Sequence, residues 1–226
     1  MGGRLVARTQ TNRVQEIGEG NAAYTVDLRG DGQIQDTIRA NRFTADTGIS
    51  IEVGNLNGVP DNTGQLTVAI EANTIVAHTG ANTREVDGEQ ENNGATGVEL
   101  EVQGSNTIAR GFAVSASLRN NRISVSNQGR NPKSKALGIG FGSVLFTAKD
   151  GTVLQQGRLS AGSLSLDLSG NRVTVTRKPG SGAAYGLHEV VEQGIFARKV
   201  TIGPSNHWVL KGEPGVAIER APAAKP

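Results

Sequence analysis

An all-β solenoid is the fold class that the sequence predicts, and three observations predict it. Residues 164–176 (LSLDLSGNRVTVT) alternate apolar and polar side chains on both sides of Gly170-Asn171, the pattern of two half-buried strands joined by a tight bend. The same pattern recurs at 118–126, 70–77 and 38–45, each with an apolar residue three before an Asn and another two after it. Glycine is abundant, at 31 of 226 residues, and aromatics make up only 4%, which suits frequent bends and an aliphatic core.

The other elements follow the chain in a repeating order. Each module contains a strand that begins with Gly, an alternating strand and an Asn bend. The Gly-led strand GISIEV at 48–53, for example, recurs as GVELEV at 97–102. The fully apolar stretch 137–146 is a further predicted strand. Polar insertions separate the modules, and their varying lengths are typical of surface loops on a repeat protein. These predicted loops lie at 54–64, 78–96, 127–136 and 177–182.

Three regions are expected along the chain. Residues 1–20 form an N-terminal leader or cap, for which the sparse apolar spacing leaves a first strand and a short helix both open. Residues 21–194 form the solenoid. Residues 195–226 carry Phe196, Trp208 and several turn signals, and are expected to form a C-terminal cap with a flexible tail.

The repeat resembles a known family. The motif I-x-x-N-x-I followed by G-[IV]-x-[IL]-x-V is similar to the right-handed parallel β-helix repeat of the pectin-lyase-like group. This resemblance implies that an Asn at each bend stacks on the Asn of the neighbouring turns of the coil. The positions that match are Asn41, Asn73, Asn121 and Asn171, with Asn106 as a further candidate.

Physical chemistry agrees with this resemblance. A bend residue in the left-handed backbone region is best tolerated as Asn or Gly, which points to the bend asparagines themselves. Inward positions are expected at Leu118, Ile123 and Val125 of one turn and at Leu168, Val173 and Val175 of the next. An antiparallel β-sandwich is the alternative fold, although Asn-Gly hairpin turns are few.

Composition limits the class of partner. The formal net charge is only +2, so no nucleic-acid partner is expected, and no apolar run is long enough to span a membrane. There is no Cys, which excludes disulfides and thiolate metal sites. The start, Met1-Gly2-Gly3, lacks the apolar core of a signal peptide, and we interpret the chain as a fragment of a longer polypeptide.

Catalytic, metal and cofactor sites are not predicted. The resemblance implies N-T-D, D-D, G-H-G and R-I-K motifs for polysaccharide hydrolases, and none is present. Asp167 is the one acid in the best-defined strands, whereas glycoside hydrolysis requires two facing carboxyl groups. The acids at 85–91 do not have calcium-loop spacing, and His78, His188 and His207 are isolated from one another.

One surface feature follows from the repeat. Arg42, Arg122 and Arg172 each come directly after a bend Asn, and Thr74 takes that place in the remaining copy. Stacked copies would align these arginines in a column, which could bind a uronic-acid polysaccharide through contacts to carboxylates. The alternative is an Arg ladder that keeps the surface soluble and prevents edge-to-edge aggregation.

The functional expectation is a non-catalytic segment of a bacterial surface or secreted protein. It would act as a rigid spacer, an adhesin or a module that binds a polysaccharide or cell-surface glycan, outside the cell or on its surface. A second hypothesis is a polysaccharide lyase or hydrolase, active or degenerate, which requires two or more acids and a Lys, Arg or His on one sheet. A third is a phage or virus fibre segment, which predicts a trimer.

Overall fold

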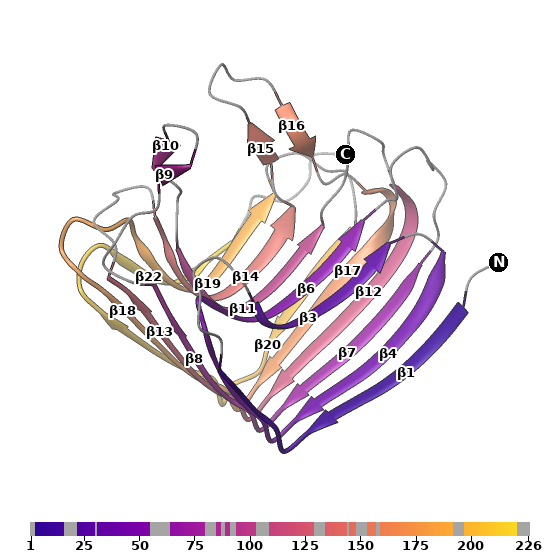
Figure 1. Ribbon diagram of the computed structural model, residues 1–226, viewed down its shortest axis with the longest axis horizontal. Coiled ribbons are helices and arrows are strands. Elements are labelled where there is room, and N and C mark those ends of the chain that lie inside the picture. Colours follow the sequence, from indigo (N-terminus) through magenta and orange to yellow (C-terminus); the bar gives the residue numbers. More distant parts are fainter. Residues whose placement is uncertain are drawn as a thin grey trace.

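Three parallel sheets of six strands each make up the computed structural model of the protein (Figure 1). The structure describes residues 3–15, 22–29, 31–54, 64–79, 85–86, 89–90, 94–102, 109–128, 134–143, 145–147, 153–156, 159–191 and 197–220. No helix among these residues is long and apolar enough to cross a membrane.

Each sheet takes every third main strand of the chain. Sheet A contains β1 (Gly3–Gln10), β4 (Gly32–Arg39), β7 (Gln65–Glu71), β12 (Ala109–Arg119), β17 (Leu159–Ser169) and β20 (Ala197–Ile202). Sheet B contains β2 (Arg13–Gln15), β5 (Arg42–Ala45), β8 (Thr74–His78), β13 (Arg122–Asn127), β18 (Arg172–Arg177) and β21 (His207–Lys211). Sheet C contains β3 (Ala22–Arg29), β6 (Thr47–Gly54), β11 (Ala95–Val102), β14 (Ala136–Ser143), β19 (Ala184–Val191) and β22 (Gly215–Glu219).

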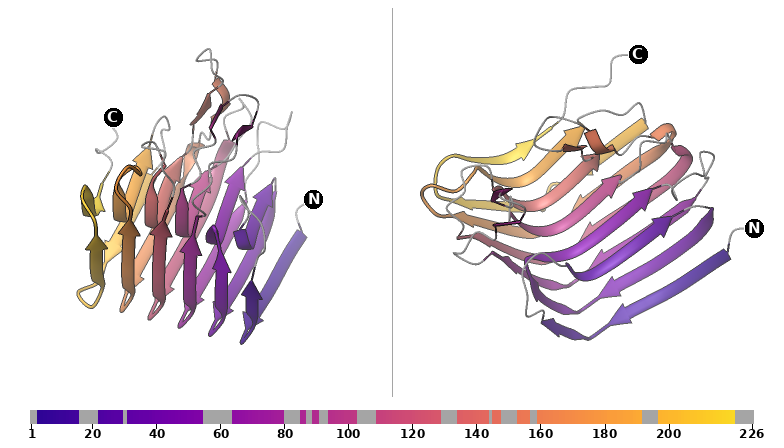
Figure 2. Two further views of the ribbon diagram at one scale, coloured as in Figure 1. Left: turned by 60° about the vertical axis from the view of Figure 1, so that its left-hand side comes forward. Right: turned by 45° about the horizontal axis from the view of Figure 1, so that its top comes forward.

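The chain visits sheets A, B and C in turn, and each circuit forms one rung that lies on the previous one (Figure 2). This confirms the predicted right-handed parallel β-helix. Because all the contacts between strands of neighbouring rungs are parallel, the antiparallel sandwich is excluded. Two short antiparallel hairpins, β9–β10 (Glu85–Val86, Glu89–Gln90) and β15–β16 (Leu145–Thr147, Val153–Gln156), project beyond the coil (Figure 1).

Parallel pairing extends beyond residues 21–194 at both ends. Strands β1 and β2, in the region for which a strand and a helix were both open, pair with β4 and β5 as the first rung. Strands β20, β21 and β22, in the region expected to form a cap, pair with β17, β18 and β19 as the sixth. The tail at 221–226 lies outside the described residues.

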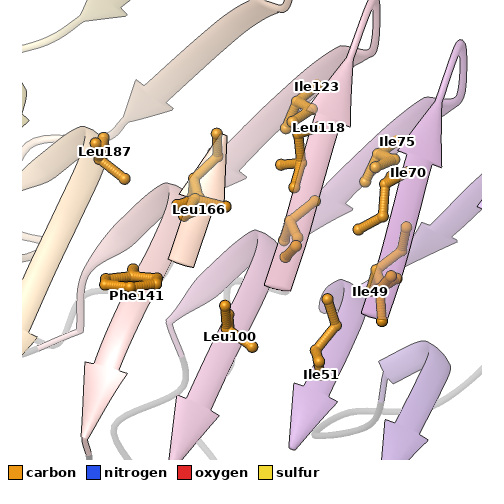
Figure 3. Packing of buried hydrophobic residues seen from close by; sticks show 14 of the residues in the cluster. Ile49, Ile51, Ile70, Ile75, Leu100, Leu118, Ile123, Phe141, Leu166 and Leu187 are labelled. Atoms are coloured by element: carbon orange, nitrogen blue, oxygen red, sulfur yellow. The ribbon is translucent and has the colours of Figure 1, made fainter. Parts of the chain in front are cut away.

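The core is a continuous aliphatic interior along the coil axis (Figure 3). The predicted inward residues of the fourth and fifth rungs are all buried, and they stack like on like, as Ile123 on Val173 and Val125 on Val175. Parallel register places each side chain against its counterpart in the next rung, so mostly aliphatic side chains fill the interior, with Phe43, Phe112 and Phe141 as its buried aromatic residues.

A column of glycines explains why a Gly leads the strands of sheet C. Gly48, Gly97, Gly138 and Gly186 follow one another from rung to rung. A Cβ on Gly97 would lie 2.5 Å from the carbonyl oxygen of Gly138 and 2.4 Å from the Ile123 side chain. Only glycine therefore lets sheets B and C approach this closely.

The bend between sheets A and B differs in one respect from the expectation. The residue with positive φ is not the Asn but the one before it: Thr11, Ala40, Ala72, Asn120 and Gly170, with φ between 53° and 66°. The preceding residue turns the chain, while the Asn is held by its side-chain hydrogen bonds. The sequence pattern located the bend but not which of its two residues carries the left-handed conformation.

Charged side chains enter the interior near the two ends. In the fifth rung, Glu189 stacks on Phe141 of the fourth. Its carboxylate pairs with Arg198 of the sixth rung at 2.8 Å and with Arg220. In the second rung the buried Asp36 accepts a hydrogen bond of 2.7 Å from the Tyr24 hydroxyl. Burial raises the pKa of Tyr24; the hydrogen bond to Thr9 lowers it, and the hydrogen bond to Asp36 raises it again.

Candidate functional site

The bend asparagines form a hydrogen-bonded ladder, as predicted. Asn73 is buried, and its Nδ2 donates to the carbonyl of Ile38 at 2.8 Å and to Oδ1 of Asn121 at 3.1 Å. Its own Oδ1 accepts from the backbone and side-chain amides of Asn41 at 2.9 and 3.1 Å. The ladder has six members, Asn12, Asn41, Asn73, Asn121, Asn171 and Asn206, and Asn106 lies outside the described residues.

The ladder places the predicted arginines in one column on the outside of the coil. Strand pairing aligns Arg42 with Thr74, Thr74 with Arg122, and Arg122 with Arg172. The column continues to Arg13 in the first rung and His207 in the sixth. All three predicted arginines and Arg13 are exposed, and none forms an ion pair with any described residue. Neighbouring positions are about 4.8 Å apart, so the arginines span about 19 Å from the first rung to the fifth.

The outer face of sheet B, which this column borders, contains no acidic residue. None of its six described strands includes Asp or Glu. Beyond the arginines, half of the outward positions are hydroxyl side chains, namely Thr44, Ser124 and Thr174 in one column, which also contains Val76 and Val209, and Ser126 and Thr176 in the next. Lys211 extends the second column. This face therefore presents guanidinium groups and hydroxyls with no intrinsic counter-charge.

Such a face can bind anions but is poorly suited to metal binding. Guanidinium donors match a carboxylate or sulfate bidentately, and hydroxyls can donate to the same groups. Within the described part of the chain, no three His, Asp or Glu residues are grouped so as to hold a metal ion.

Sheet C has the opposite character, which sequence reasoning missed. Asp27, Glu52 and Glu101 lie in register on its outer face. Glu99 lies two residues before Glu101 in β11 and therefore on the same face. Arg29 pairs with Asp27 at 2.6 Å and with Glu52 at 3.0 Å. Burial holds the pKa of Glu99 well above its usual range, reinforced by a hydrogen bond to Glu101 and by the negative charges of Glu101 and Glu52.

The same face carries a histidine two rungs further along. His188 aligns with Gly140, which aligns with Glu99, so only a glycine separates them in this column. Burial lowers the pKa of His188, and the charge of Lys135 lowers it further, against the opposing effect of Glu219 at 2.7 Å. His188 is thus neutral near pH 7 and donates to the Glu219 carboxylate. The adjacent Glu189 points inward, so His188 and Glu189 face opposite sides of sheet C.

Some of these features were recoverable from the sequence. Asn12-Arg13-Val14 repeats the Asn-Arg-Val of 171–173, and Asn206 has an aromatic residue, Trp208, two positions after it. These two motifs could have extended the asparagine ladder and the adjoining arginine column to six rungs. The acidic face had no such signal, because its members come from different rungs without a shared motif. Only the register shows that they are neighbours.

Comparisons with protein-family models, with curated proteins and with solved structures find no match to this chain.

Proposed function

We propose that the protein is a rigid, non-catalytic β-helix module of a cell-surface or secreted bacterial protein that binds an acidic polysaccharide along sheet B. One observation carries the proposal: four exposed arginines, Arg13, Arg42, Arg122 and Arg172, lie in register on a sheet without acids. An extended polyanion laid along the coil axis would meet a guanidinium in four of the first five rungs.

Multivalency is what makes such a face useful. A single exposed charge pair contributes little, with a median of about 0–1 kcal/mol. Several contacts to one polymer add, because the first contact raises the effective concentration for the others. Rigid stacking of the rungs limits the conformational entropy lost on binding. The interaction should weaken strongly with salt, because the arginines are exposed.

The test is retention on immobilised alginate, a linear uronic-acid polymer, with heparin and neutral dextran run in parallel. The triple variant Arg42→Ser, Arg122→Ser, Arg172→Ser should elute at markedly lower salt than the unmodified protein on the acidic columns. Dextran should retain neither.

A matched control removes the same charge elsewhere. Arg4, Arg8 and Lys199 are exposed on the outer face of sheet A, and their triple replacement by Ser also changes the net charge by −3. The control variant should elute close to the unmodified protein. Equal losses in the two triple variants, or unchanged retention of the sheet B variant, would overturn the proposal.

Polysaccharide cleavage on sheet C is a second candidate, favoured by the carboxyl groups of Glu99 and Glu101 and the neutral His188 on one face. Its raised pKa lets the Glu99 carboxyl group keep its proton to higher pH than an ordinary glutamate, which suits general acid catalysis. Release of reducing ends or of unsaturated products from acidic and neutral polysaccharides measures this activity. No release by the unmodified protein, or equal release by Glu99→Gln, would eliminate sheet C as a catalytic site.

A further inference from the structure

A buried arginine that pairs with no carboxylate of the described residues lies where sheet B ends and the chain turns toward sheet C. Arg177 is the last residue of β18 and occupies an inward position, with only 8% of its surface exposed. It lies beside Asn127 in the next rung, and the backbone of Gly212 approaches it from the other side. A Cβ at Gly212 would lie 3.0 Å from Arg177 Cγ, so the glycine leaves room for the arginine stem.

The hydrogen bonds of Arg177 are incomplete. Its Nε donates to the carbonyl of Lys178 at 3.3 Å, and its buried Nη1 has no partner. The Lys178 carbonyl already accepts from the amide and hydroxyl of Ser181 at 3.2 and 2.8 Å, so the bond from Arg177 is the longest of three. Asn127 is held by Thr79 and Ser134 instead.

No carboxylate neutralises this guanidinium among the described residues. The contrast is Arg198, which is also largely buried but pairs with Glu189 at 2.8 Å. A guanidinium keeps its charge at every accessible pH, and a buried charge is costly unless it is paired. The charged residues next to this corner are Lys178, which follows Arg177, Lys211, which lies opposite Thr176, and the exposed Glu213, which follows Gly212 and forms no ion pair with Arg177.

We propose that Arg177 anchors a binding site for a single oxyanion, a carboxylate, sulfate or phosphate group, at the corner between sheets B and C. The unpaired Nη1 supplies a buried charged donor, and Lys178 and Lys211 supply positive potential at the entrance. The anion could come from solution or from an acidic polymer. The site stands independently of the arginine column, since it lies at the other end of the strands of sheet B.

The first test compares thermal unfolding in sodium sulfate and sodium chloride at equal ionic strength. Sulfate stabilises proteins in general, so the informative quantity is the difference between variants. The unmodified protein should show an additional, saturable rise in unfolding temperature, about 5–10 °C at a hundredfold excess over Kd. Arg177→Gln should lose this additional rise, and Arg8→Gln, at an exposed arginine on the outer face of sheet A, should keep it.

A second measurement applies to the unmodified protein and does not depend on the variant folding. The Nε–H signal of Arg177 is followed by NMR during titration with inorganic phosphate, sulfate and, separately, a short uronate oligosaccharide. Saturable shifts with the inorganic anions identify a free oxyanion as sufficient, and shifts with the oligosaccharide alone identify a polymer group. An unshifted signal in all three titrations, or an equal sulfate response in Arg177→Gln and the unmodified protein, would overturn the proposal.

Discussion

At the scale of single residues, asparagine is well suited to the bend because one short side chain supplies both donors and an acceptor. Asn73 satisfies the backbone carbonyl of Ile38 and the backbone amide of Asn41, two buried groups that the bend removes from the sheet ladders. A leftover buried polar group costs about 1–3 kcal/mol. The stacking of asparagines is therefore hydrogen-bond satisfaction repeated once per rung.

Replacing Asn73 by Ala should lower the free energy of unfolding by about 3 kcal/mol, because several buried groups lose their partners together. Urea denaturation measures the change. The control is Asn120→Gly at the exposed position before Asn121, where φ is +55° and the next rung already has Gly170; it should change stability by less than about 1 kcal/mol. Equal effects of the two substitutions would show that the ladder does not stabilise the bend.

Glu99 gives stability a specific pH dependence. Its folded pKa is raised, so above pH 4.5 the unfolded chain releases this proton more readily than the folded protein, and stability falls as pH rises through the folded pKa. Glu99→Gln removes this penalty. We expect the variant to unfold at a higher temperature than the unmodified protein at pH 8, with little difference at pH 4.5. Asp167→Asn, at an exposed acid of sheet A, serves as the control, and a parallel pH profile of Glu99→Gln and the unmodified protein would contradict the prediction.

At the scale of strands, the glycine column sets the distance between sheets B and C. Each glycine leaves room for the carbonyl of the next rung and for a β-branched or aromatic side chain of sheet B, Ile75, Ile123, Val173 or Trp208. The strand that begins with glycine is thus a packing requirement of the three-sided coil.

Gly97→Ala should destabilise the protein by about 3 kcal/mol, because its Cβ would overlap a backbone oxygen that cannot move independently of β14. Gly140→Ala, in the neighbouring strand, is the matched control. Its Cβ would lie 3.5 Å from the nearest atom, an ordinary contact, and we expect a change within about 0.5 kcal/mol. Similar urea midpoints for both variants would refute the steric argument.

Sequence reasoning worked for features that repeat along the chain. The Asn bends, the Gly-led strands and the inward aliphatic residues such as Ile123 and Val173 share local spacing, and local spacing determines which face a residue occupies. The relation between Glu52, Glu99 and His188 depends on the register between strands 40 or more residues apart. That the guanidinium of Arg177 is unpaired depends on which side chains fail to reach a buried corner of the fold. Neither leaves a periodic signal.

At the scale of the whole molecule, each rung contacts only the rungs above and below it (Figure 2). Stability in such a coil is the sum of rung stabilities and nearest-neighbour contacts, so the two ends have half the support of the middle. Amide hydrogen exchange should therefore be slowest in β7, β12 and β13 and fastest in β1 and β22. Uniform protection along the coil would indicate a single cooperative unit instead.

The ionic group of Glu189, Arg198 and Arg220 gives the rod two chemically different ends. At the sixth-rung end, β22 also exposes the apolar side chains of Val216 and Ile218, beside the ion pair of Arg220. At the opposite end, β1 is the edge strand of sheet A, and its Leu5 is 55% exposed. A further strand of compatible register could cover this side chain. The two edges would therefore offer an added strand different side chains: Leu5 and Val6 at the first rung, and Val216, Ile218 and a charged group at the sixth.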